Sequence, residues 1–478
     1  MQQNLDHSYF KMVFNSSSDQ YAAYTLKDRH RSRKSLMPFE ALTLGNLPTF
    51  THPENQIKVA IVGAGISGLG AAHMLSKTHN VTLFEAEGRL GGHARTKLAG
   101  KRGDQPVDTG FIVFNYANYP YMAALFEELE VPVVKSNMSF GASIDGGALE
   151  YALTSLDALF AQRRNAVNPA FLRMVRDILK FNKHAIRVAQ DESLTLGEFL
   201  DKMGTGPWFR DYYLLPLSGA IWSTPVEKIM DFPAYALIRF FENHALLNTT
   251  GQHQWYTVQG GSTQYVWRLE NALLAQGVDM RLGAAVQSVR RAGGKAFIRP
   301  WGGEEEAFDH VIMATHSDDS LKMLADPSAQ ETAALGAVAY QPNDIVLHAD
   351  ESIMPKRKKT WASWVYTEDK NALSDRIDLT YWMNSLQPIP HDDPHFVTLN
   401  TKRTIREELI YDQVTLRHPV YDLAALAAQK EVAAFNGAQN TWFCGAWMKN
   451  GFHEDGLSSA VDVVRKLRSN EQMKVAAE

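Results

Sequence analysis

The segment GAGISG holds three glycines, Gly63, Gly65 and Gly68, at the spacing of a dinucleotide-binding turn. The first glycine permits a tight turn, the second lets backbone amides approach a pyrophosphate, and the third lets the next helix pack on the preceding strand. Ile66 and Ser67 lie at the expected start of that helix, whose dipole favours an anion. The spacing therefore predicts a pyrophosphate site.

An acidic residue stands where such a turn needs one. Glu85 follows a second apolar run, residues 81–84, and lies 22 residues after Gly63. A carboxylate at this distance accepts hydrogen bonds from the adenosine ribose and repels a 2′-phosphate. We include the adjacent Ala86 in the same contact.

A second glycine group follows the acid. Arg89, Gly91, Gly92, Arg95 and Thr96 come directly after it. A nicotinamide enzyme has no need of this group, whereas the pyrophosphate and ribityl chain of a flavin can use further backbone amides and a guanidinium. The pattern favours FAD over NAD.

These residues must be positioned by an alternation of strands and helices. Residues 57–62 read as a buried parallel strand, 67–77 as a helix, and 308–316 as a further buried strand. Near the C-terminus, a predicted strand ends at Cys444 and Gly445, and a predicted helix begins near Leu457. The loop between them carries His453, Glu454, Asp455 and Gly456.

From Ile57 to Leu467 the chain resembles the flavin-containing amine oxidase superfamily, which includes amine oxidases, carotenoid-type desaturases and lipid-linked members. The superfamily pattern Arg-x-Gly-Gly-x-x-x-Thr is matched by Arg89, Gly91, Gly92 and Thr96. His93 stands where amine oxidases usually have Arg. The resemblance therefore implies the fold and the cofactor, but not amine chemistry.

The resemblance also implies contacts for FAD in the rest of the chain. The backbone of Val286 would meet the adenine, and the N-terminus of the last helix would stabilise negative charge on the flavin pyrimidine. The cofactor residues expected in this last segment are Gly445, His453, Glu454, Asp455, Gly456 and Leu457.

Several side chains near the expected flavin have two interpretations. His453 and Glu454 are either an acid–base pair or residues that shape the loop. Trp447 either walls the substrate pocket or only packs. Cys444 is either a covalent flavin anchor or, as we expect, a small buried residue at a strand end. We expect His316 to be structural.

The predicted fold class is α/β, with a Rossmann-type FAD-binding domain and a discontinuous α+β substrate domain. We assign residues 56–115, 255–320 and 435–470 to the FAD-binding domain, and 116–254 and 321–434 to the substrate domain. Residues 1–55 are expected to be a flexible N-terminal extension, with an organelle presequence as the alternative. The folded chain is expected to begin near Ile57.

The two insertions suggest an apolar substrate. They are rich in aromatic and aliphatic residues, which suits a pocket or tunnel for an extended apolar molecule. No acidic cluster or aromatic cage for an ammonium group stands out, which counts against amines. Thr195 and Glu198 predict a capping box. The expected pocket residues are Asn115, Tyr381, Met383 and Asn384.

A basic run precedes two tryptophans. Lys356, Arg357, Lys358 and Lys359 come shortly before Trp361 and Trp364. This composition suits a membrane interface, where cations meet anionic headgroups and indoles lie at the boundary. A solvated basic turn followed by core tryptophans explains it equally well.

Composition limits the remaining classes of function. The 478 residues carry a net charge of −5 with both signs dispersed, which does not call for nucleic acid as a partner. A single cysteine excludes a disulfide framework and a cysteine metal cluster, and we expect no metal site. No apolar run approaches the ~20 residues that span a bilayer. The expected location is the cytoplasm, with peripheral contact to the inner membrane face.

The motifs GFIVFN and GFHEDGL, and both segments of the second insertion, resemble a bacterial branch of NAD/FAD-binding proteins. That branch is associated with methylation and cyclopropanation of membrane fatty acyl chains, including furan fatty acid formation. It implies an FAD-dependent dehydrogenase or desaturase of modified acyl chains in phospholipid. The alternatives are a flavin amine oxidase, a fatty acid double-bond isomerase, and a non-catalytic flavoprotein partner of a lipid methyltransferase.

Overall fold

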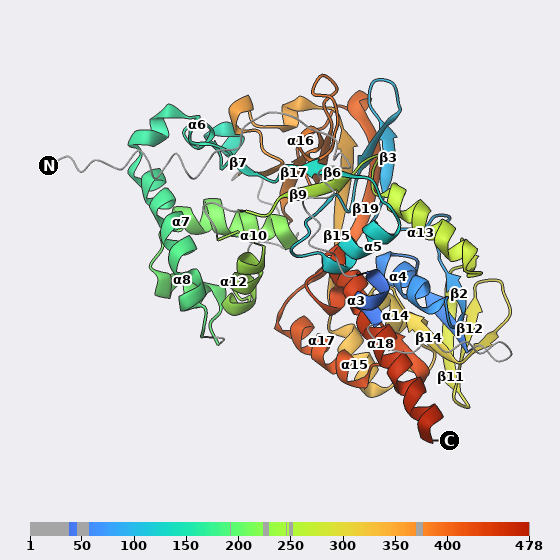
Figure 1. Cartoon of the computed structure of the whole chain (residues 1–478). Coiled ribbons are helices and arrows are strands. Elements are labelled where there is room, and N and C mark those ends of the chain that lie inside the picture. The colour runs from blue at the N-terminus through green and yellow to red at the C-terminus, as the bar shows by residue number, and fades with distance from the viewer. Residues whose placement is uncertain are drawn as a thin grey trace.

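The structure, a computed structural model, describes residues 38–44, 57–191, 193–222, 229–244, 246–247, 252–369 and 376–477. It has two halves, and each is assembled from separated stretches of the chain (Figure 1). We call them the parallel-sheet half and the mixed-sheet half after their sheets. This α/β architecture confirms the predicted fold class.

A five-stranded parallel sheet forms the first half. Its strands, in spatial order, are β10 (Asp279–Arg281), β2 (Asn80–Phe84), β1 (Lys58–Val62), β14 (His310–Met313) and β20 (Thr441–Phe443). All neighbours are parallel, and four of the five residues of β1 are buried because helices and a second sheet cover both faces. The strands predicted at residues 57–62, 81–84 and 308–316 are therefore present.

Helices pack on one face of this sheet and a mixed layer covers the other. The first layer contains α3 (Phe39–Leu44), α4 (Ile66–Leu75), α5 (Pro120–Glu128), α13 (Thr263–Ala275) and α18 (His453–Ala477). The second contains β11 (Val286–Ala292), β12 (Lys295–Pro300), β13 (Glu306–Phe308), α14 (Ser317–Met323), α15 (Ala329–Gly336) and α17 (Leu423–Phe435). The result is a three-layer nucleotide-binding architecture.

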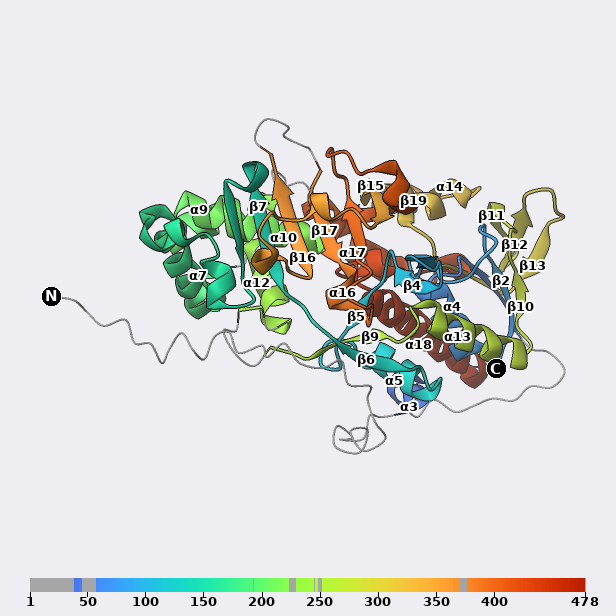
Figure 2. The same cartoon turned by 90° about the horizontal axis from the view of Figure 1, so that it is seen from above.

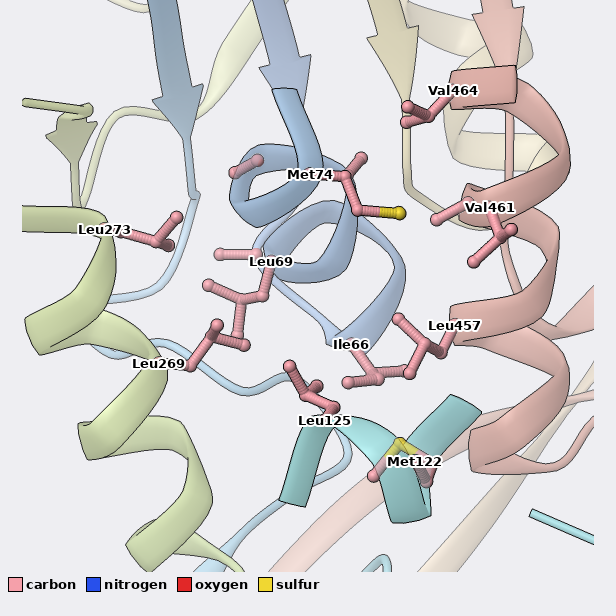
Figure 3. Packing of buried hydrophobic residues seen from close by; sticks show 14 of the residues in the cluster. Ile66, Leu69, Met74, Met122, Leu125, Leu269, Leu273, Leu457, Val461 and Val464 are labelled. Atoms are coloured by element: carbon pink, nitrogen blue, oxygen red, sulfur yellow. The ribbon is translucent and has the colours of Figure 1, made fainter. Parts of the chain in front are cut away.

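The helix that follows the glycine turn lies at the centre of the first layer. Figure 3 shows α4 between α13, α18 and α5, with Leu69 and Leu457 among the side chains that fill the gaps. A Cβ added at Gly70 would lie 2.4 Å from Cδ1 of the Leu457 side chain, so the glycine leaves room for Leu457 where α18 crosses α4. The N-termini of α4 and α18 are thereby held together.

A seven-stranded sheet and a group of helices form the second half. The strands, in spatial order, are β19 (Ile410–Val420), β15 (Ala339–His348), β18 (Phe396–Leu399), β17 (Asp378–Trp382), β16 (Trp364–Glu368), β7 (Phe140–Ile144) and β8 (Leu149–Ala152). The helices, which we call the helical lobe, are α6 (Leu156–Leu159), α7 (Pro169–Val188), α8 (Leu196–Met203), α9 (Pro207–Phe209), α10 (Leu215–Trp222) and α12 (Ala234–Asn243). The lobe lies at the end of the molecule away from the C-terminus (Figure 2). Thr195 and Glu198 form the expected capping box of α8.

Short strands and one helical turn connect the halves. They are β3 (Thr96–Ala99) with β4 (Gln105–Asp108), β5 (Val113–Phe114) with β9 (Trp255–Val258) and β6 (Val133–Ser136), and α16 (Met383–Leu386).

Two sequence expectations differ from the structure. Helix α18 begins at His453, one turn before Leu457. Helix α3 lies within the predicted N-terminal extension, and Phe39 is buried in the core, so ordered structure precedes Ile57. Residues 1–37 and 45–56 lie outside the described residues.

The packing also shifts the domain limits. Helices α5, α15 and α17, which we assigned wholly or largely to the substrate domain, pack in the cores of the parallel-sheet half. Their apolar faces complement the sheet and its covering helices, a preference that local composition does not reveal.

Candidate functional site

A cavity of about 1140 Å³ extends from the glycine turn after β1 into the helical lobe. Pockets for one small ligand usually have roughly 300–1,000 Å³, so this cavity is large enough for a cofactor and a substrate together. The predicted cofactor residues that line it are Gly63, Gly65, Ile66, Ser67, Glu85, Ala86, Gly92, Val286, Gly445 and His453.

The glycine turn provides an anion site. Gly63 has a φ of +99°, and a Cβ added there would lie 2.8 Å from the Ala314 carbonyl oxygen. A Cβ at Gly65 would meet no atom within 4 Å, so the space before the N-terminus of α4 is open. No side chain caps this helix. Its first amides are therefore available to a phosphate, and the cradle fits the FAD pyrophosphate.

Glu85 lies on the cavity wall in a fixed orientation. Its Oε2 accepts a hydrogen bond from the Ala64 amide at 2.7 Å, and its Oε1 accepts one from the Glu87 amide at 2.8 Å. Val286 lines the same end of the cavity. This placement suits a ribose and an adenine, as the sequence predicts.

Two of the predicted glycines, Gly68 and Gly91, do not line the cavity but support the glycine turn from behind. A Cβ at Gly68 would lie 1.8 Å from the Gly63 carbonyl oxygen, so this glycine is required for packing of α4 on the turn. The Gly91 amide donates to the Ala64 carbonyl at 2.8 Å. These glycines set the shape of the cradle without lining it.

The predicted guanidiniums and Thr96 also brace the turn from outside. Arg89 donates to the Gly92 carbonyl at 2.9 Å, and Arg95 forms an ion pair with Asp412. The Thr96 hydroxyl donates to Asp108 at 2.6 Å. None of these three predicted side chains lines the large cavity, so the expected charge balance by a guanidinium does not match their contacts.

His453 reaches the cavity from the first turn of α18. Its ring stacks on Phe111 with centroids 4.1 Å apart, and its Nε2 lies 2.6 Å from the Tyr265 hydroxyl. Burial lowers the pKa of His453 to about 3, so the ring is neutral at pH 7. The ring is held rigidly on both sides.

Glu454 and Asp455, both expected at the cofactor, do not line the cavity. Glu454 therefore does not form an acid–base pair with His453 there, and its other interpretation, as a residue that shapes the loop, fits its contacts. Glu454 accepts hydrogen bonds from the Tyr121 and Met122 amides, both at 2.8 Å, and so caps α5. Asp455 accepts from the Phe452 amide at 2.9 Å. Burial raises the pKa of Glu454 to about 7 and that of Asp455 to about 6. Because α18 starts one turn early, these side chains point along its sides.

Gly456 and Leu457, also expected at the cofactor, hold helices together instead. A Cβ at Gly456 would lie 2.8 Å from Ile66, and Leu457 is fully buried in the core.

The structure distinguishes between the two interpretations of Trp447 and of Cys444. Trp447 lines the cavity and is also core, and its Nε1 donates to the Thr315 carbonyl at 3.1 Å. Cys444 is fully buried and does not line the cavity. Burial raises the pKa of its thiol to about 12, so the thiol is unreactive. The structural interpretation of Cys444 matches its surroundings.

Of the four expected pocket residues, the cavity is lined by Tyr381. Asn115 accepts from the Ala117 and Asn118 amides and so shapes the start of α5. Asn384 donates to backbone carbonyls of its own loop, and Met383 is fully buried. The predicted strand ends at Trp382, so residues 383 and 384 turn away from the cavity.

Three of the histidines that line the cavity lie close to one another, although the sequence did not indicate them as site residues. The ring centroid of His93 lies 6.0 Å from that of His316 and 5.6 Å from that of His418. Burial lowers the pKa of His316 to about 4 and that of His418 to about 3, and it also lowers the pKa of His93. We call them the histidine cluster.

Two details indicate that the cluster belongs to the site. The Nε2 atom of His93 is buried without a hydrogen-bond partner among the described residues. His316, which we expected to be structural, stacks on Tyr340 with centroids 4.3 Å apart and faces the cavity. The replacement of the family Arg by His93 was the only sequence signal, because the cluster comes from three distant segments.

The carboxylates next to the cluster belong to an ion-pair network. His316, Asp318 and Asp319 place ligand atoms within 4.8 Å of one another. Both aspartates are paired with Arg417 and Lys322. Their charges are thus already balanced by side chains.

The other end of the cavity is apolar. It is lined from the helical lobe by Leu159, Val175, Ile178, Leu179, Asn182, Tyr213, Leu217, Ile221, Phe240 and His244. Among the described lining residues, carboxylates come from Glu85, Glu87 and Asp319, all in the parallel-sheet half or at its edge. No described helix is long and apolar enough to cross a membrane.

Known proteins share this fold over most of the chain. A cyclohexylamine oxidase from Brevibacterium oxydans matches 87% of this chain and 100% of its own, with a TM-score of 0.63 and 14% identity. A fatty acid isomerase from P. acnes that produces CLA matches 86% and 98%, with a TM-score of 0.62 and 15% identity. At these identities the likeness establishes the fold.

Curated sequences match over shorter stretches. The putative flavin-containing monoamine oxidase AofH of Mycobacterium tuberculosis is 27% identical over 58% of this chain, and the match spans 61% of its own length. Protoporphyrinogen oxidase 2 of Arabidopsis thaliana is 60% identical over 42 residues, which is 8% of its length.

The sequence profile of the flavin-containing amine oxidoreductases matches residues 66–464. That match runs from the first turn of α4 to α18 and includes both ends of the cofactor cradle. The chain therefore belongs to the flavin-containing amine oxidoreductase family and is an FAD-dependent oxidoreductase.

Proposed function

We propose that the protein is a dehydrogenase, or desaturase, of modified fatty acyl chains in membrane phospholipid, such as methyl-branched or unsaturated chains. The observation that carries the proposal is the continuity of the cavity from the cofactor cradle into the apolar helical lobe. An extended acyl chain fits such a lining, since its burial is favoured by about 0.8 kcal/mol for each CH₂ group. Membership of the bacterial branch linked to acyl modification is part of this proposal.

Charge distribution supports a neutral substrate over an amine. The lobe offers no carboxylate among its described cavity-lining residues, so an ammonium group there would lack a counter-ion. The family match and the similarity to AofH favour the amine oxidase, which is therefore the second candidate. The shared fold with a fatty acid isomerase makes double-bond isomerisation the third.

When bound, FAD supplies a two-electron oxidation by accepting a hydride from a C–H bond. The neighbouring carbon then has to lose a proton, so that a C=C bond forms and the charges balance. We assign this proton to the histidine cluster, whose neutral rings face the cavity, while His453 Nε2 is engaged with Tyr265. Oxygen or a quinone would take up the electrons afterwards.

The test is reduction of the flavin under anaerobic conditions. The loss of flavin absorbance measures that reduction. Membrane phospholipid with methyl-branched, unsaturated chains should bleach the flavin, and mass spectrometry should find acyl chains lighter by two hydrogens. A panel of polyamines and aromatic amines should leave it oxidised. Bleaching by amines alone would establish the amine oxidase instead.

Two further outcomes would overturn the dehydrogenase. Lipid that changes its double-bond position without a change in mass would indicate isomerisation. A flavin that no substrate reduces, in a protein that co-purifies with a lipid methyltransferase, would indicate a non-catalytic partner.

A further inference from the structure

The outer end of the helical lobe is strongly basic. Between residues 163 and 187 the chain has seven Arg or Lys residues and a single acid, although the whole chain has a net charge of −5. The basic residues are Arg163, Arg164, Arg173, Arg176, Lys180, Lys183 and Arg187, and all seven are exposed. This segment is the short turn before α7 and α7 itself, at the far end of the lobe (Figure 2).

On α7 the cations form one stripe. The five on the helix recur every three or four residues, which places them on one face. The single acid, Asp177, is 1% exposed, and it accepts a hydrogen bond from the Gly206 amide at 2.8 Å. Its carboxylate also lies 3.6 Å from Arg173 and 3.5 Å from Arg176. Among the described residues, Lys180, Lys183 and Arg187 of the stripe have no carboxylate partner, so these three present unpaired cations to solvent.

The neighbouring face of the same helix lines the cavity. Val175, Ile178, Leu179 and Asn182 are lining residues. Exposed Leu172 and Ile186, which are 42% and 39% exposed, lie seven residues before and after the lining residue Leu179. Helical spacing therefore places all three in one row, at the edge of this face nearest the basic stripe. Around α7, an apolar cavity wall is thus followed by exposed aliphatic side chains and then by cations.

Just before α7, Val167 adds an exposed aliphatic side chain at 81% exposure. Apolar groups beside a row of cations are the arrangement of a helix that lies in a membrane interface. The helix also forms part of the wall of the cavity that is proposed to receive the acyl chain.

The basic run before the tryptophans is less suited to this task. Arg357 and Lys359 are paired with Glu150 and Asp157, and Lys358 with Glu351. Trp361 donates through Nε1 to the Pro355 carbonyl and is half-buried against a core cluster. Arg357, Lys358 and Lys359 thus all have carboxylate partners, as Arg163, Arg173 and Arg176 do, whereas Lys180, Lys183 and Arg187 have none among the described residues.

We propose that the exposed face of α7 docks on an anionic phospholipid membrane and brings the apolar end of the cavity next to the acyl chains. Cations attract the headgroups, and the aliphatic residues between stripe and cavity enter the headgroup boundary. Delivery of an acyl chain to the cavity by this contact rests on the proposed function. Membrane binding itself is measured separately from turnover.

The test uses the FAD-loaded protein and vesicles of phosphatidylcholine, with or without one third phosphatidylglycerol. The wild type should sediment with the anionic vesicles and not with the neutral ones. The triple variant R176Q/K183Q/R187Q should bind the anionic vesicles at least about tenfold more weakly, because each cation near the surface contributes about fivefold. The control R102Q/K430Q/K466Q removes three exposed cations elsewhere and should bind as the wild type does.

A second variant tests the aliphatic part. Ile186→Ser should weaken binding while leaving its dependence on salt unchanged. Equal binding to neutral vesicles would overturn the proposal, as would a triple variant that binds normally. An oligonucleotide held as tightly as the anionic vesicles at the same salt would also overturn it, in favour of a general polyanion site.

Failure of the proposed function gives a different result. Lipid dispersed in detergent should reduce the flavin of the triple variant as it does that of the wild type, because the cavity is intact. Vesicle binding without any reduction by dispersed lipid would leave the docking face established and the dehydrogenase refuted.

Discussion

The two ends of the cavity differ in whether backbone or side chains form the wall. At the cofactor end, the wall is mostly backbone, and glycines at Gly63, Gly65 and Gly92 keep it open. At the lobe end, the wall is made of side chains such as Leu179 and Leu217. A backbone wall recognises what all members of a family bind, whereas a side-chain wall can change its ligand without a change of fold. The first end thus defines the cofactor, and the second determines the substrate.

The largest effect is expected from adding a side chain to the backbone wall at the cofactor end. Gly65→Asp places a carboxylate in the open space before α4, where it would oppose the FAD pyrophosphate. We expect at least a hundredfold loss of FAD affinity, measured by flavin retention during gel filtration and by titration of the apoprotein. Gly88→Asp, at an exposed glycine with open space, is the control and should retain FAD.

A large side chain at the other end should act on the substrate alone. Leu179→Trp fills part of the lobe end of the cavity, so the protein should keep its FAD and lose at least about tenfold in the rate of flavin reduction by lipid. Stopped-flow absorbance measures this rate. Leu274→Trp, at a residue that is 58% exposed on α13, should leave it unchanged. Loss of FAD in Leu179→Trp would show that the two ends are not independent.

The histidine cluster lies between the two ends and should make stability depend on pH. Burial lowers the pKa of His418 to about 3, so the folded protein resists protonation that the unfolded chain accepts below about 6.5. Stability should therefore fall as the pH drops from 6.5 towards 4, with up to about 1.4 kcal/mol per pH unit from this residue.

Urea unfolding of the holoprotein at pH 7, 6 and 5 measures that slope. His418→Gln should reduce it, whereas His391→Gln, at an exposed histidine, should not. An unchanged slope in His418→Gln would place the titration on the other two histidines of the cluster, His93 and His316.

The smallest effect is expected at Glu454, which caps α5 and does not face the cavity. Burial raises its pKa to about 7, so its carboxyl group favours folding below pH 4.5 and loses that contribution as the pH rises through about 7. Glu454→Gln should change stability by about 1 kcal/mol and remove this dependence. The pH profile of flavin reduction should stay the same, and a shifted profile would restore Glu454 as an acid–base group.

The sequence predicted the cofactor end well because its rules are local. A glycine turn, a strand and an acid at a fixed distance are all visible within thirty residues, and Gly63, Gly65 and Glu85 line the cavity as expected. The predictions for Glu454 and Asn384 were wrong for a related reason. A helix that begins one turn early and a strand that ends at Trp382, before Asn384, rotate side chains away from the cavity.

The histidine cluster could not be predicted from local sequence patterns. His93, His316 and His418 come from a loop, a strand end and the strand β19, and only the complete fold brings them together. The basic stripe of α7 is local in sequence, but its meaning depends on which face of the helix lines the cavity.

The strand order of the parallel sheet also governs how the protein is made. Strand β1 pairs with β14, and β14 pairs with β20, which comes more than 370 residues after β1 in the chain. Helix α4 lacks its partner α18 until that later segment has been translated. At ribosomal speeds the nascent chain carries this apolar surface uncovered for tens of seconds. Chaperones that shield apolar helices should therefore govern the yield of active protein.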